Sequence, residues 1–202
     1  NLENAMGLFL SMSGIIEKSK NEIETSFRKF IDKKIKKKYS KNTTEYNCLL
    51  HNKNKNTTLI YPNCFSEYEE SSKFISKDLS YLVFSFCIYD GDYWEYSLYQ
   101  NGKLIDVFTP IPTYWDETIS EEETLEVKGD AKLIAKLIEN VKIEDIKNYL
   151  IRWDLDGLPE KAYSDDECEY GDCWQLTDFM NKVGLEYPID DEGNSKGSIF
   201  LI

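Results

Sequence analysis

The stretch Tyr81–Thr109, YLVFSFCIYDGDYWEYSLYQNGKLIDVFT, decides the expected fold. Two runs rich in aromatic and β-branched residues, 81–89 and 93–99, flank an Asp-Gly-Asp turn at 90–92. A third run follows Asn-Gly at 101–102, a pair favoured in type I′ hairpin turns. In the first run every second residue is apolar, as in a strand with one buried face. The stretch therefore predicts a three-stranded antiparallel meander whose apolar face must be covered by other elements.

The residues before this stretch predict one helix, two short strands and a second, shorter helix. Residues 20–38 repeat apolar side chains at helical spacing, and Lys33–Lys38 places five lysines where the helix dipole favours cations. Residues 46–51 and 57–61 are typical of short strands, and residues 66–79 of a short helix. We therefore expect the sheet to occupy about residues 46–109, with an amphipathic helix before it.

The residues after the meander predict a mainly helical part at about residues 120–183. Ser120 and Glu123 form a capping-box pattern. Apolar spacing predicts helices at 130–140, 143–153 and 172–183, which would cover the sheet. The apolar tail 199–202 is suited to an edge strand.

These elements predict a single α+β domain over residues 6–202. It would contain an antiparallel meander sheet of about five to six strands covered by helices. Met6-Gly7 resembles a natural chain start, so residues 1–5 are interpreted as a cloning remnant. The oligomeric state is not predicted.

The net charge of −13 is spread unevenly over the 202 residues. Residues 1–45 hold ten Lys and Arg against six Asp and Glu, or +4, whereas the remainder holds fourteen against thirty-one, or −17. A surface this acidic repels phosphate backbones, which argues against nucleic-acid binding outside the first segment. The charge is consistent either with simple solubility or with attraction of a basic protein partner.

The cysteine pattern and the hydropathy predict a cytoplasmic protein that does not enter the membrane. No stretch approaches the length of a membrane span. The cysteines are odd in number and lack CxxC spacing, which predicts reduced thiols and no zinc site. They are Cys48, Cys64, Cys87, Cys168 and Cys173. No cofactor is expected.

The single histidine restricts nucleophilic catalysis. Any Ser-His or Cys-His arrangement would have to use His51, which ends a predicted strand beside a Lys- and Asn-rich loop, in a setting that predicts exposure. The sequence contains no Gly-x-Ser-x-Gly elbow, P-loop or Gly-x-Gly-x-x-Gly motif. We therefore expect no catalytic residues, although carboxylate-only hydrolysis stays open.

Two similar short motifs could supply such carboxylates. Asp90-Gly91-Asp92-Tyr93-Trp94 and Tyr170-Gly171-Asp172-Cys173-Trp174 each combine carboxylate, glycine and tryptophan. If the turns meet, they would form a polar pocket for a small-molecule hydrolase or binding enzyme, which is the alternative function. The competing interpretation is that the first motif makes a hairpin turn, Asp172 caps a helix and the tryptophans anchor the core.

A proline-stiffened loop, Pro110–Asp116, adds exposed-looking aromatic residues. Tyr and Trp in such a loop serve either as interface anchors or as core residues folded back inward. Combining this loop with the acidic residues gives a candidate partner-binding surface. It comprises Asp90, Asp92, Trp115, Asp116, Asp165, Asp166, Glu167 and Asp172.

Three motifs resemble those of a family of small uncharacterised bacterial proteins, over most of the chain. They are Met6-Gly7-Leu8-Phe9, Tyr114–Ser120 (YWDETIS) and Tyr170–Trp174 (YGDCW). The resemblance implies no activity. In size, acidity and α+β make-up the chain is also similar to immunity proteins of polymorphic-toxin systems. Since that similarity involves no specific motif, it implies a binding role but assigns no residues. The leading hypothesis is therefore a non-catalytic domain that binds a basic toxin or another basic protein.

Overall fold

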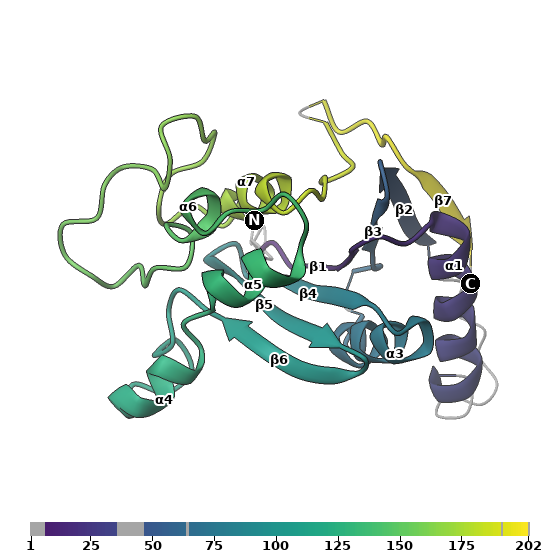
Figure 1. The fold of residues 1–202 in the computed structure, drawn as a ribbon, viewed down its shortest axis with the longest axis horizontal. Coiled ribbons are helices and arrows are strands. Elements are labelled where there is room, and N and C mark those ends of the chain that lie inside the picture. Colours follow the sequence, from purple (N-terminus) through teal and green to yellow (C-terminus); the bar gives the residue numbers. More distant parts are fainter. Residues whose placement is uncertain (1–6, 36–46, 64, 191, 202) are drawn as a thin grey trace, which may run out of the picture. The chain divides into compact units, whose positions relative to one another are not determined.

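The computed structural model describes residues 7–35, 47–63, 65–190 and 192–201 and has the expected α+β architecture (Figure 1). Its sheet is antiparallel and has the strand order β6-β5-β4-β1-β3-β2-β7. The strands are β1 (Leu10–Ile15), β2 (Asn47–Lys53), β3 (Asn56–Ile60), β4 (Leu82–Tyr89), β5 (Tyr93–Gln100), β6 (Lys103–Phe108) and β7 (Ser198–Leu201). The α-helices are α1 (Lys20–Phe30), α3 (Tyr68–Leu79), α4 (Glu121–Glu126), α5 (Ala131–Leu137), α6 (Ile143–Ile146) and α7 (Gln175–Lys182).

The predicted meander is confirmed as β4, β5 and β6. Both of its turns have consecutive residues with positive φ, at Asp90 (54°) and Gly91 (77°) and at Asn101 (54°) and Gly102 (75°). Two positive φ values in succession define the type I′ turn, whose twist matches that of the flanking strands. The predicted edge strand is also present, since β7 pairs with β2 at the end of the sheet.

The expected strand count of about five to six was too low, because the described sheet has seven strands. The additional strand is β1, which lies between β4 and β3. Met12, Ser13, Gly14 and Ile15 are all buried, so this part of β1 has no solvent-exposed face, although Leu10–Ser13 alternates apolar and polar residues. Position 14 is closely packed, because a Cβ there would lie 2.3 Å from Leu185 Cδ1, so a larger residue would require that side chain to shift.

The N-terminal helix differs from the single helix expected at 20–38. An α-helix spans Lys20–Phe30, and the chain continues as a π-helical turn, η1 (Ile31–Ile35). Residues 36–38 lie outside the described residues. The helical part is also more broken than expected, because the predicted helix 143–153 is α-helical only over Ile143–Ile146. The capping box of Ser120 and Glu123 at the start of α4 is confirmed.

The chain divides into two compact units built from interleaved segments. Unit 1 comprises Asn1–Leu10, Cys87–Tyr96 and Asp106–Val183, and unit 2 comprises Ser11–Phe86, Ser97–Ile105 and Gly184–Ile202. The division separates the charge. Unit 1 holds 24 Asp and Glu against eight Lys and Arg, a net charge of −16, whereas unit 2 holds 13 against 16, or +3.

The core of unit 1 is aromatic. Trp94 is fully buried, and its ring centroid lies 5.0 Å from that of Phe108 and 5.2 Å from that of Phe179. The ring of Tyr96 stacks on Phe179 at 5.7 Å. Helix α7 therefore packs on β5, as expected for a helix covering the apolar face of the meander.

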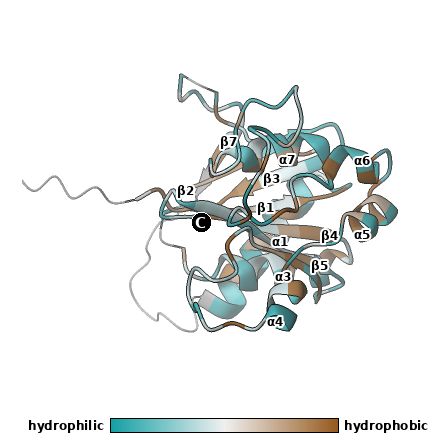
Figure 2. Cartoon of the chain, turned by 90° about the vertical axis from the view of Figure 1, so that its left-hand side faces the viewer, coloured by the Kyte–Doolittle hydropathy of each residue, from teal (hydrophilic) through white to brown (hydrophobic). Residues whose placement is uncertain are grey.

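The core of unit 2 joins helices α1 and α3 to strands β2 and β3. Ile23, Phe27 and Phe30 of α1 are buried in one cluster with Ile75 of α3 and Leu59 of β3. Figure 2 shows these helices with hydrophobic and hydrophilic segments alternating along the ribbon, as amphipathic helices require. None of the described helices combines the length and the hydropathy needed to cross a membrane.

Candidate protein-binding surface

Unit 1 exposes a cluster of aromatic rings beside the β4–β5 turn. The aromatic cluster comprises Phe9, Tyr89, Tyr93, Tyr114 and Trp115. The ring of Tyr89 lies 4.7 Å from Trp115 and 5.0 Å from Phe9, and Tyr93 lies 4.8 Å from Tyr114, measured between centroids. Trp115 is 67% exposed and Phe9 43% exposed, so the cluster presents apolar area to solvent. The hypothesis that the loop folds Trp115 back into the core is therefore wrong.

Hydrogen bonds hold these rings in place. Trp115 Nε1 donates to the Tyr93 hydroxyl at 3.1 Å, and the Tyr114 hydroxyl donates to Asp92 Oδ2 at 2.5 Å. The bond to Asp92 raises the pKa of Tyr114 to about 12, so Tyr114 stays a donor at neutral pH. The rings are thus ordered before any partner arrives, which lowers the entropy cost of binding.

Carboxylates adjoin the aromatic cluster. Asp90, Asp92 and Asp116 are all exposed. Asp116 Oδ1 accepts hydrogen bonds from the backbone and hydroxyl of Thr118, and these bonds lower the pKa of Asp116. Asp90 packs against Gly7, where a Cβ would lie 1.5 Å from Asp90 Oδ1. Apolar rings with neighbouring charges resemble the core and rim of a protein interface.

Of the other predicted surface residues, Asp165 and Glu167 are exposed but Asp166 is buried. Asp165 forms an ion pair with Lys182 at 2.9 Å. Asp166 is only 6% exposed and accepts hydrogen bonds from the Tyr149 hydroxyl and the Tyr163 backbone. Burial raises the pKa of Asp166. Asp166 therefore holds the connector before α7 in place, and its carboxylate does not face a partner.

The two glycine-containing turns come close enough for their carboxylates to act on one thiol. Burial, together with the charges of Asp172 and Asp92, raises the pKa of Cys173 to about 11. Such a thiol is protonated at neutral pH and is a weak nucleophile. Asp172 Oδ1 accepts a hydrogen bond from the Trp174 backbone at 2.8 Å in the turn before α7. The N-cap residue of α7 is Trp174 and no described side chain caps this helix, so the predicted capping role of Asp172 is wrong. The alternative function uses the carboxylates of these turns and not the thiol, so it stays a prediction.

The described residues contain no group of three or more His, Cys, Asp or Glu side chains that could hold a metal ion. The four described cysteines, Cys48, Cys87, Cys168 and Cys173, are free thiols. Cys64 lies outside the described residues.

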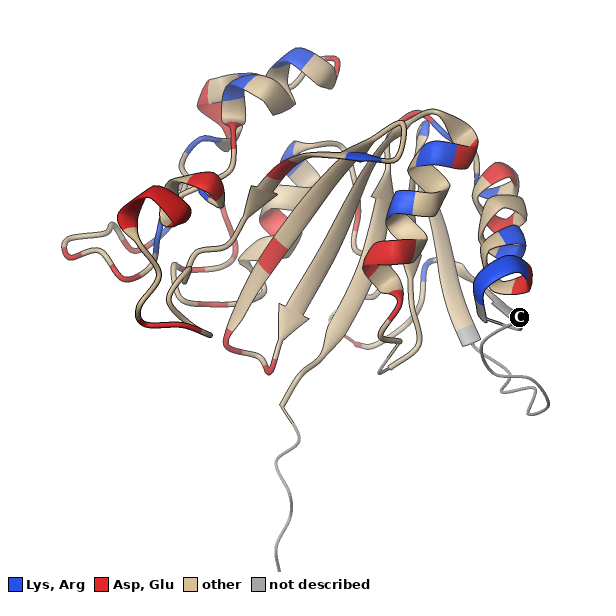
Figure 3. Cartoon of the chain, turned by 90° about the horizontal axis from the view of Figure 1, so that it is seen from below, with Lys and Arg blue, Asp and Glu red and all other residues tan. Residues whose placement is uncertain are grey.

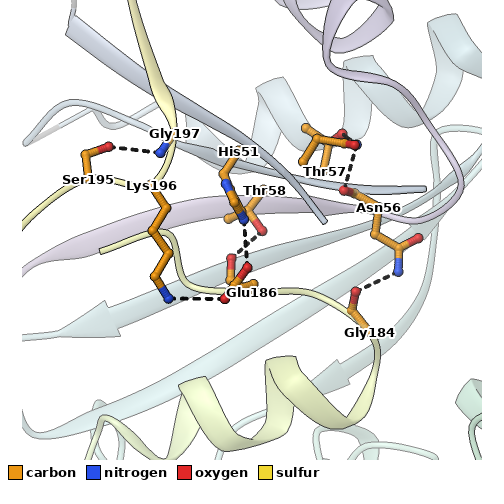
Figure 4. Close-up of polar contacts among 10 residues, drawn as sticks. His51, Asn56, Thr57, Thr58, Gly184, Glu186, Ser195, Lys196 and Gly197 are labelled. Atoms are coloured by element: carbon orange, nitrogen blue, oxygen red, sulfur yellow. Dashed lines mark hydrogen bonds and ion pairs between the residues drawn. The ribbon is translucent and has the colours of Figure 1, made fainter. Parts of the chain in front are cut away.

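His51 belongs to a polar cluster of unit 2 and is more enclosed than its sequence setting predicts (Figure 4). Its side chain is 14% exposed, and Nε2 lies 2.8 Å from Glu186 Oε2. The other oxygen of Glu186 accepts from Lys196 Nζ at 3.2 Å, and Thr58 donates to the Glu186 backbone carbonyl at 2.9 Å. Within the described residues no serine or cysteine hydrogen-bonds to His51. The cluster therefore fastens the C-terminal segment to β2 and β3.

Replacing Glu186 with glutamine is expected to make the free energy of unfolding fall less steeply as the pH becomes acidic. Burial alone would raise the pKa of Glu186, but its hydrogen bonds to His51 and Lys196 outweigh burial and lower it. A carboxylate whose pKa is lower in the folded than in the unfolded state stabilises the fold at pH values above its unfolded-state pKa. This stabilisation is lost as the pH falls through its folded-state pKa. We expect the wild type to lose about 1 kcal/mol more than Glu186→Gln between about pH 5 and pH 3.

Urea unfolding at several pH values measures this difference. Glu17→Gln is the control in the same unit, because the Glu17 side chain forms no hydrogen bond within the described residues, and its curve should follow the wild type. Parallel curves for Glu186→Gln and the wild type would contradict the role assigned to Glu186.

Comparison of the chain with protein-family models, curated proteins and solved structures gives no match.

Sequence patterns missed two contributors to the surface, Phe9 and Tyr89. Phe9 stands in a short apolar segment next to β1, and the backbone carbonyl of its neighbour Leu8 accepts a hydrogen bond from Gly91 at 2.9 Å. Tyr89 ends a strand whose other residues are buried. The apolar pair Leu8-Phe9 was the one sequence signal for Phe9, in a segment to which the sequence patterns assigned no helix or strand.

Proposed function

We propose that this protein is a non-catalytic binding domain that holds a basic protein partner, in the manner of an immunity protein that masks a basic toxin. The observation that supports this most is the exposed aromatic cluster with carboxylates beside it, in a unit of net charge −16. Figure 3 shows acidic residues gathered on α4 and the loops of unit 1, with few charges on the strands.

The two features would contribute differently to binding. Buried aromatic anchors supply most of the affinity at interfaces, because they remove large apolar areas from water at low entropy cost. Opposite charges mainly speed association and select the partner. A basic protein would therefore be attracted by the charge of unit 1 and held by contacts with Trp115 and Phe9.

Neutralising the carboxylates next to the cluster is expected to weaken this complex in a salt-dependent way. The full chain is immobilised and used for capture from a lysate of the source organism, at roughly 0.1 M and 1 M salt, where the Debye length falls from about 10 Å to about 3 Å. We expect the wild type to retain a stoichiometric basic protein at low salt. The double variant Asp92→Asn/Asp116→Asn should retain less of it at low salt, with a smaller difference at high salt.

Glu122→Gln/Glu126→Gln is the matched control. These two exposed glutamates of α4 remove the same charge from unit 1, outside the aromatic cluster. The control should capture nearly as much partner as the wild type. Equal capture by both double variants would show that total charge, and not this surface, attracts the partner. Capture of no protein at either salt would contradict the proposed function.

A further inference from the structure

Unit 2 contains a cavity that the proposed function does not use. It has a volume of about 760 Å³ and lies between the end of α1 with η1 and helix α3. Its lining includes Lys33, Lys34, Lys73 and Lys77 together with Phe30 and Phe74. This volume falls within the range of small-molecule sites, about 300–1,000 Å³. The site is an open groove, because its lysines and carboxylates are exposed.

The cavity is positively charged in a chain that is acidic overall. Its four lysines face only two lining carboxylates, Glu70 and Asp78. Asp78 is already paired with Lys29, whose Nζ lies 2.9 Å from Asp78 Oδ2. Unit 2 as a whole carries +3. The local charge therefore favours an anion, whereas the −16 of unit 1 disfavours one.

Three of the lysines have no ion-pair partner in the part of the chain that the structure describes. They are Lys34, Lys73 and Lys77. Lys73 and Lys77 stand one helical turn apart on α3, so both ammonium groups can reach the same ligand. Figure 3 shows basic residues along both α1 and α3.

The rest of the lining is aromatic. The ring centroids of Phe30 and Phe74 lie 5.6 Å apart with their planes tilted by 56°, and Phe30 is fully buried. Lys33 Nζ lies 5.6 Å from the centroid of Phe74, within cation–π range. Only Phe74, which is half-buried, offers ring surface to a ligand, and the fully buried ring of Phe30 packs beside it. A ligand with a flat apolar body could rest on Phe74 while the lysines hold its charge.

We infer that this cavity binds a small organic anion, an aromatic body bearing a sulfonate, phosphate or carboxylate group. The apolar body would contact the half-buried ring of Phe74, and the anionic group would be held by Lys73 and Lys77, with Lys34 nearby. An anion with an apolar body matches the lining better than an inorganic anion, because it would also cover the exposed part of Phe74. The site is independent of the aromatic cluster of unit 1.

The test uses two fluorescent probes that differ in one charged group. 8-Anilinonaphthalene-1-sulfonate is the anion, and N-phenyl-1-naphthylamine is its uncharged counterpart. Each is titrated into the full chain and into Lys73→Gln/Lys77→Gln. We expect one site for the anion and an affinity about tenfold lower in the double variant. The uncharged probe should bind more weakly than the anion and equally to both proteins.

Lys132→Gln/Lys136→Gln is the matched control, because these exposed lysines stand one turn apart on α5 of unit 1. The control should bind the anion as the wild type does. Equal affinity of all three proteins for the anion would overturn the inference, as would equal binding of the two probes to the wild type. Lys34→Gln gives a second readout with an expected smaller loss, so the test does not depend on one variant.

Discussion

Trp94→Ala is expected to lower the free energy of unfolding by about 3–5 kcal/mol, the usual cost of removing a large buried aromatic side chain. Trp94 is fully buried between Phe108 and Phe179, and Nε1 donates to Gln175 Oε1 at 3.3 Å. Its removal leaves a cavity between β5 and α7 and an unpaired amide oxygen. Both effects act in the same direction. Urea unfolding followed by circular dichroism measures the change.

Trp115→Ala is the control for this experiment. It removes the same side chain from the same unit, but Trp115 is 67% exposed. We expect it to cost less than about 1 kcal/mol, as surface substitutions usually do. A loss below about 1 kcal/mol for Trp94→Ala, or equal losses for the two variants, would contradict the packing described for unit 1.

The same Trp115→Ala variant is expected to have its largest effect on partner binding. Truncating an aromatic anchor at an interface centre costs about 2 kcal/mol or more, or roughly a thirtyfold rise in Kd. Unlike the carboxylate variants, Trp115→Ala should lose affinity at both low and high salt, because apolar contact is not screened. Calorimetric titration of the purified partner into wild type and variant measures the ratio.

Leu125→Ala controls for the loss of exposed apolar area. Leu125 of α4 is 53% exposed in the same unit and is not part of the aromatic cluster. Its substitution should leave Kd within about twofold of the wild type, because few residues dominate binding energy. If Trp115→Ala binds the partner as tightly as Leu125→Ala does, the aromatic cluster is not the binding surface.

The meander was predictable because its signals are local. The aromatic and β-branched residues of β4 and β5 favour strands, and the Asp-Gly and Asn-Gly pairs specify tight turns, each over a few residues. The capping box at Ser120 is local in the same sense, since donor and acceptor stand three residues apart.

Short elements with weak sequence signals were harder to predict. Strand β1 is short, and its sequence LSMSGI contains two serines and a glycine, one β-branched residue and no aromatic residue, so it lacks the composition typical of strands. Short helices are similarly ambiguous, because one turn such as α6 shows less than one period of an amphipathic pattern.

The candidate surface was predictable in part. The exposure of Trp115 and Asp116 agrees with a charged, proline-stiffened loop on the surface. Asp166 stands between exposed Asp165 and Glu167 yet is buried, because Tyr149, seventeen positions earlier, supplies its hydrogen bond. A run of three acidic residues gives no indication of which one turns inward.

By itself, the sequence determined the α+β class, the antiparallel meander with its two turns, and an acidic character concentrated after residue 45. These follow from backbone preferences and charge, which act locally or sum over the chain. Only the tertiary structure decided that Phe9 and Tyr89 join Trp115, that the charge divides into units of −16 and +3, and that four lysines surround two phenylalanines. The reason is that packing unites residues far apart in the chain, whereas sequence periodicity reports only on near neighbours.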